Sequence, residues 1–103
     1  MMFGKGELSF TEPVTAIKAH AIGKLIRQRG FFNNEMRVSV HVCQEDGIYQ
    51  LKFVIKPSHI NDTETKVVLM KLCRRISANA LGGRPVVLHL CDDKLRTYQR
   101  EHL

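Results

Sequence analysis

The chain lacks the features that would place it in a membrane or outside the cell. Its 103 residues contain no tryptophan and no apolar run near the roughly 20 residues that span a bilayer. The first ten residues hold one lysine and no stretch typical of a signal peptide. Cys43, Cys73 and Cys91 are odd in number and widely spaced, which does not indicate a disulfide framework. We therefore expect a cytoplasmic protein with free thiols and no membrane partner.

The common catalytic signatures are missing too. Gly82-Gly83 has neither the P-loop nor the dinucleotide-binding pattern, and it follows a predicted helix, where it suits a helix stop. The adjacent acids at 45–46 and 92–93 fall in an expected turn and an expected cap. No nucleophile, base and orienting group can be recognised together. We expect no catalytic residues, no cofactor and no enzymatic activity.

Acidic residues are in the minority. The chain contains sixteen lysines and arginines and ten aspartates and glutamates, which gives a formal net charge of +6. A positive excess of this kind favours a polyanionic partner such as nucleic acid. The length fits a single domain covering residues 1–103, and 44% hydrophobic residues is ordinary for a globular chain.

The stretch that is best defined is a β-hairpin within residues 35–57. Val40 and Val42 alternate with His41 and Cys43 in its first arm, and apolar and polar residues alternate again from Tyr49 to Ile55. This period of two is the main signal of a strand. Asp46-Gly47 supplies the positive φ angles of a tight turn between the arms.

Two amphipathic helices flank the hairpin. The first is predicted from Thr11–Pro13 to about Arg29 and the second from Asn61 to about Leu81, because capping residues begin each and glycines follow each. The predicted buried side of the first helix is Val14, Ile17, Ala21 and Leu25, with Ile22 and Ile26 beside it. Residues 86–91 read as a third strand. Residues 94–103 are predicted to form a short helix or a tail, and residues 1–10 are expected to be flexible or a short strand.

The predicted fold class is α+β, a two-layer sandwich with an antiparallel-rich sheet and both helices on one face. The order is αββαβ, or ferredoxin-like βαββαβ if residues 7–10 pair as a strand. The strand order is left open. In this picture Arg37, His41, Lys52 and His89 point outward from the uncovered face of the sheet.

Three binding hypotheses follow. The leading one is a small non-enzymatic interaction domain that dimerises through its sheet face or edge, because apolar residues occupy positions expected to be exposed. These residues are Ile48, Val54 and Val87 on the sheet, and Val67, Met70 and Leu81 on the second helix.

The alternative is a nucleic-acid-binding protein. Its predicted contact residues are Lys71, Arg74, Arg75, Arg84, Lys24 and Arg27. The chain lacks aromatic residues placed for stacking with bases, so phosphate contacts with little sequence readout are expected.

The third hypothesis is a metal or small-ligand site on two His-x-Cys strands. His41 and Cys43 share a face, as do His89 and Cys91, and imidazole and thiolate groups suit a tetrahedral zinc site. In the ferredoxin-like strand order, however, these strands stand at opposite edges of the sheet, about 14 Å apart. One metal could not bridge that distance.

Overall fold

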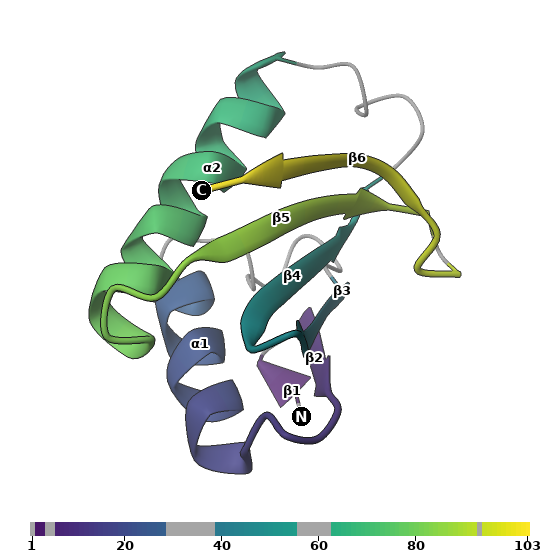
Figure 1. Ribbon diagram of the computed structural model, residues 1–103. Coiled ribbons are helices and arrows are strands. Elements are labelled where there is room, and N and C mark those ends of the chain that lie inside the picture. The colour runs from purple at the N-terminus through teal and green to yellow at the C-terminus, as the bar shows by residue number, and fades with distance from the viewer. Residues whose placement is uncertain (1, 4–5, 29–38, 56–62, 93) are drawn as a thin grey trace.

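The computed structural model describes residues 2–3, 6–28, 39–55, 63–92 and 94–103. It is an α+β fold in which two helices cover one face of a mixed sheet, as predicted (Figure 1). The predicted βαββαβ order is confirmed by β2 through β5, and a further strand lies at each side. The elements are β1 (Met2–Phe3), β2 (Gly6–Phe10), α1 (Ala16–Gln28), β3 (Ser39–Glu45), β4 (Ile48–Val54), α2 (Thr63–Ala80), β5 (Val86–Cys91) and β6 (Thr97–His102).

The strands lie in the sheet in the order in which they occur along the chain, from β1 to β6. β2 is parallel to β3 and β4 is parallel to β5, so each helix connects two neighbouring parallel strands. A ferredoxin-like sheet interleaves these two units, whereas here they stand side by side. As a consequence, β3 and β5 flank β4 and do not lie at opposite edges.

The hairpin is confirmed. β3 and β4 pair antiparallel, with Val40 opposite Phe53 and Val42 opposite Leu51. All four of these side chains are buried in the core. Asp46 and Gly47 have φ angles of 53° and 78°, the conformation that the Asp-Gly pair predicts for a tight turn.

The first helix begins later than predicted. The Thr15 hydroxyl accepts a hydrogen bond from the Lys18 amide at 3.2 Å, so Thr15 is the N-cap and Pro13 lies in the preceding turn. The buried side of the helix is Ala19, Ile22, Gly23 and Ile26, and Ile17 lies away from it, 83% exposed. The prediction that Ile17 faces the core was therefore wrong.

The second helix is described from Thr63, and Asn61, its predicted start, lies outside the described residues. Leu81 was predicted on the outer side of this helix but is buried in the core. The reason is that the chain leaves the helix there: the Gly83 amide reaches back to the Ser77 carbonyl at 2.8 Å, and Gly82 and Gly83 have positive φ.

The C-terminal segment is a strand and not the predicted short helix. Asp92 Oδ1 accepts hydrogen bonds from the Lys94 and Arg96 amides, both at 2.9 Å, which closes a tight turn. Leu95 in this turn has a φ of 63°. The chain therefore reverses at once, and β6 pairs antiparallel with β5. Asp92 does bind backbone amides as a cap would, but the structure it supports is a hairpin.

Both helices pack their apolar sides on the same face of the sheet (Figure 1). Leu69, Leu72 and Ile76 of α2 and Ile22 and Ile26 of α1 meet the inward side chains of β2 to β5 in one core. In the part of the chain that the structure describes, neither helix is long and apolar enough to cross a membrane.

Candidate nucleic-acid interface on the helical layer

The positive charge of the chain is concentrated in the two helices. Together α1 and α2 contain seven lysines and arginines and one acidic residue, Glu64. The rest of the chain contains nine of each kind, so its formal charges cancel. The formal net charge of +6 is therefore carried by the layer that covers the sheet.

These charges lie on two helices that contact each other. Lys18 near the start of α1 donates from Nζ to the Ala80 carbonyl at the end of α2, at 3.0 Å, so the helices run side by side in opposite directions. All six residues predicted to contact nucleic acid are exposed. Five lie on the helices, Lys24, Arg27, Lys71, Arg74 and Arg75, and Arg84 follows the end of α2.

These six side chains are not neutralised by acidic neighbours within the described residues. The ion pairs found there join Lys66 to Glu101 at 2.5 Å and Arg96 to Asp92 at 2.7 Å. Neither pair involves the six. Unpaired guanidinium and ammonium groups at a surface are available to bind phosphate.

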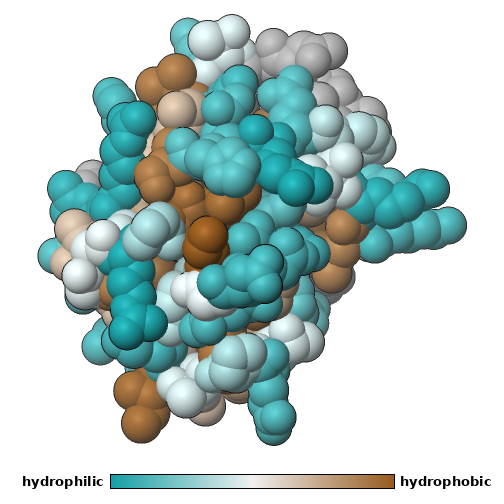
Figure 2. Space-filling view, viewed as in Figure 1, coloured by the Kyte–Doolittle hydropathy of each residue, from teal (hydrophilic) through white to brown (hydrophobic). Residues whose placement is uncertain are grey.

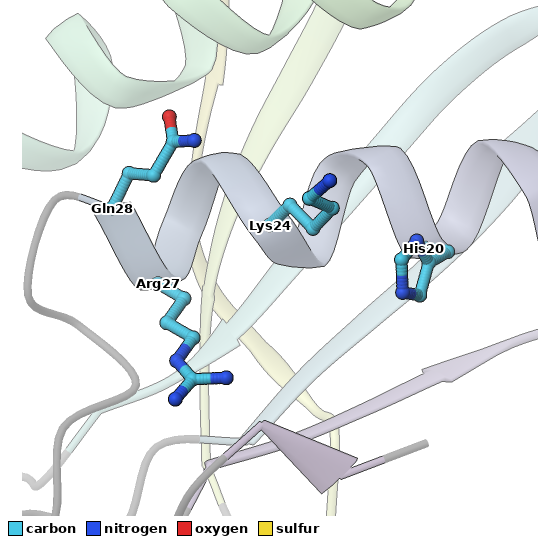
Figure 3. Close-up of a pocket in the computed structure, with 4 residues that line it drawn as sticks. All are labelled: His20, Lys24, Arg27 and Gln28. Carbon is cyan, nitrogen blue, oxygen red and sulfur yellow. The ribbon is translucent and has the colours of Figure 1, made fainter.

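A shallow groove of about 430 Å³ runs along the polar side of α1. It is lined by His20, Lys24, Arg27 and Gln28, which follow one another along the helix (Figure 3). Residues 20 to 28 span about 12 Å at the α-helical rise. Three of the four side chains are basic, so the groove suits an anion. Neither His20 nor Gln28 was among the residues predicted from the sequence to contact nucleic acid.

The opposite face of the sheet carries a polar row. Strand register places Ser9, His41, Lys52, His89 and Arg100 in line across β2 to β6. The prediction that His41, Lys52 and His89 point away from the helices is thus confirmed, whereas Arg37, the fourth residue of that prediction, lies outside the described residues.

His89 is the buried member of this row, with 3% of its surface exposed. Its Nε2–H donates to Gln50 Oε1 at 2.5 Å, and its Nδ1 is hydrogen-bonded to the Thr97 hydroxyl at 3.0 Å. Burial lowers the pKa of His89, and the nearby charges of Lys52 and Arg100 lower it further.

The proposed metal ligands are not gathered into a site. Among the described residues, no three His, Cys, Asp or Glu side chains are placed to hold one ion. The two His-x-Cys strands are closer than expected, about 10 Å apart across β4. The His89 ring nitrogens are both engaged, and burial raises the pKa of the Cys43 and Cys91 thiols. This geometry gives the metal hypothesis no support.

Comparison with known proteins adds a family. The sequence pattern of one family matches residues 2–100, which is nearly the whole chain. The chain belongs to the AF_1994_N family. This family is described as an N-terminal domain. No curated protein and no solved structure matches the chain.

The residues predicted to form an interface fall on two surfaces. Ile48 and Val54 are half-buried on the outer face of the sheet, and Val87 is buried there between its neighbours. Val67 on α2 is 42% exposed, and Met70 packs partly against the core. The structure therefore separates a sheet-face group from a helix group.

The His89 network predicts a loss of stability on acidification. Because the pKa of His89 is lowered in the fold, the unfolded chain takes up this proton more readily as the pH falls through the ordinary histidine value near 6.5. The free energy of unfolding should then be lower at pH 5.5 than at pH 7.5. We expect His89→Gln to reduce this difference in urea unfolding experiments.

His41 also makes the fold less stable at low pH, because burial and, to a smaller extent, the Lys52 charge lower its pKa. Part of the pH dependence of the free energy of unfolding should therefore remain in His89→Gln. An unchanged pH dependence in His89→Gln would show that His89 is not the titrating group.

Proposed function

We propose that this domain binds nucleic acid through the sugar–phosphate backbone, using the exposed surface of α1 and α2. The observation that carries the proposal is the segregation of charge: the helices hold seven basic residues and one acidic residue, and the rest of the chain is balanced. A charge that served solubility alone would not need to gather on one layer. A basic layer instead attracts a polyanion and releases its counterions.

The chemistry of this surface favours phosphate over bases. Arg74, Arg75 and Arg27 offer planar donor groups that match phosphate oxygens, and Lys24 and Lys71 add point charges. The large apolar side chains exposed on the two helices are aliphatic, Ile17, Val67 and Val68, and none can stack on a base. We therefore expect the affinity to come mainly from charge interactions with phosphates and to depend little on the base sequence.

The groove on α1 provides the place for part of the backbone. His20, Lys24 and Arg27 line it within about two turns, and Gln28 adds an amide donor at its end (Figure 3). A chain of phosphates lying along the helix would meet a basic group at about each turn. The groove fits a single strand or one strand of a duplex equally well.

Two further observations fit this role. The three cysteines are free and two of them are buried, with burial raising the pKa of Cys73 to about 12. Inert free thiols suit the reducing cytoplasm, where nucleic acid is accessible. A family described as an N-terminal domain also suits a binding module that works beside other domains.

The test is a salt titration of binding to DNA and RNA of mixed sequence. If the six exposed basic residues contact phosphates, log K should fall linearly with log salt concentration, with a slope of up to about −5 for duplex DNA. Affinity at physiological salt should lie in the range of about 10⁻⁴ to 10⁻⁶ M that is typical of non-specific binding.

A neutral-backbone oligonucleotide of the same sequence is the control and should not bind. Absence of binding at low salt, or binding that salt does not weaken, would rule the proposal out.

A further inference from the structure

The face of the sheet opposite the two helices, called the open face below, has a cation near its centre. Lys52 on β4 lies between His41 of β3 and His89 of β5. Burial and then the charge of Lys52 lower the pKa of both histidines. Burial raises the pKa of the Cys43 and Cys91 thiols, and the same charge opposes this rise. Because charge interactions weaken with distance, the ammonium group must lie close to all four side chains.

A second cation lies on the other side of His89. Arg100 of β6 is opposite His89 in the register, so the three residues Lys52, His89 and Arg100 form one row across β4, β5 and β6. Neighbouring strands are about 4.8 Å apart, which puts the Cα atoms of the two cations about 10 Å apart. Both side chains are longer than the imidazole between them. Their charged ends can therefore approach each other above His89.

His89 is fixed at the bottom of this row. It is 3% exposed, whereas Lys52 is half-buried and Arg100 is exposed. Its ring nitrogens are hydrogen-bonded to Gln50 and to the Thr97 hydroxyl, so the ring is held in place. Figure 2 shows hydrophilic residues over most of β6, and hydrophobic residues gathered beside α2. The row thus presents two charges to solvent on a polar surface.

The two cations of this row have no acidic partner among the described residues. The ion pairs found there involve Lys66 and Arg96 instead. The carboxylates that share the open face lie toward its margins. Glu7 is opposite Ser39 at the start of β3, and Glu45 is at the end of the same strand. The like charges of the row repel each other, and an anion placed between them would remove this repulsion.

We propose that the open face binds one small phosphorylated ligand, whose phosphoryl group lies between Lys52 and Arg100 above His89. A phosphate monoester carries a charge of about −1.5 to −2 at neutral pH, which matches two cations. Its oxygens can accept hydrogen bonds from an ammonium and a guanidinium group at the same time. A carboxylate carries a single charge and would leave one of the two cations unmatched.

The acidic margins of the open face favour a small ligand over a nucleic acid. A chain of phosphates running along β3 would approach Glu7 at one end and Glu45 at the other, where like charges repel. The helical layer has one acidic residue, Glu64, among seven basic ones. The two surfaces therefore suit different anions, and binding at the open face does not depend on binding of nucleic acid at the helices.

The first test is a titration with inorganic phosphate, followed through the imidazole NMR signals of His41 and His89 at low salt. A bound phosphoryl group offsets the charge of Lys52, so the signals should change to saturation and the pKa of both histidines should rise. Sodium chloride at the same ionic strength is the control, because it only screens charge and should not saturate. No saturable response, or the same response to chloride, would overturn the proposal.

The second test uses variants at half-buried or exposed positions, which should stay folded. Lys52→Gln and Arg100→Gln each remove a charged contact and should weaken phosphate binding about tenfold or more. In Lys52→Gln the pKa of His41 should already be higher, and phosphate should raise it no further. Lys94→Gln removes the same charge from the turn before β6 and should bind phosphate like the original chain. Unchanged binding in both row variants, or an equal loss in Lys94→Gln, would contradict the proposed site.

The third test separates two sources of a phosphoryl group. Adenosine monophosphate should change the His41 signal as inorganic phosphate does and should compete with it. A single-stranded oligonucleotide should leave this signal unchanged, whether or not it binds at the helical layer. If the oligonucleotide shifts His41 as phosphate does, the open face binds nucleic acid and the proposal of a small ligand is wrong.

Discussion

Replacing Lys71 and Arg74 together by glutamate is expected to weaken binding to duplex DNA about 100-fold at 0.1 M salt. The reason is that each phosphate contact contributes close to tenfold in affinity at this salt concentration, through counterion release. Both residues lie on the exposed side of α2 and have no ionic partner among the described residues. The slope of log K against log salt should become shallower by about two. Fluorescence anisotropy with a labelled duplex measures both quantities.

The matched control is Lys52→Glu combined with Lys94→Glu. It changes the formal charge by the same amount, but Lys52 lies on the open face of the sheet and Lys94 in the turn before β6. If the whole net charge acted at long range, both double variants would lose affinity alike. Equal losses would therefore show that affinity follows the net charge of the chain and not contacts of the helical layer, and melting curves would confirm that each variant is folded.

Phe53→Ala is expected to lower the free energy of unfolding by about 3–5 kcal/mol, the cost of truncating a fully buried aromatic residue. Phe53 is completely buried, and its strand lies between β3 and β5, where it faces Val40 and Leu90 across the register. The free energy of unfolding of a small domain is only about 5–15 kcal/mol in total. This single change should therefore remove a large share of the stability and move the midpoint of urea unfolding sharply lower.

Val68→Ala is the comparison for this experiment. Val68 is exposed on α2, so its truncation should change the free energy of unfolding by no more than about 0.5 kcal/mol. A small effect of Phe53→Ala would mean that the central strand is not packed as the structure describes, and the shared core of both helices would have to be reconsidered.

The sequence by itself determined the hairpin, the two helices and the side of each helix that carries charge. Alternation over β3 and β4 is long enough to fix which side chains face inward, and Asp46-Gly47 fits only a tight turn. The six basic residues could be named in advance for the same reason: helical periodicity separates Lys24 and Arg27 from the apolar side of α1 without reference to any other element.

Only the tertiary structure decided how these elements are placed relative to one another. Strand order depends on which strands meet, and local pattern does not encode it, so the side-by-side arrangement of the two βαβ units could not be read from the chain. β6 was missed because its six residues are mostly polar and form an edge, where no buried face imposes an alternating pattern. The hydrogen bond between His89 and Gln50 and the shared core of the two helices depend on contacts between segments distant in sequence. Such contacts follow from packing in three dimensions, which no local pattern of residues specifies.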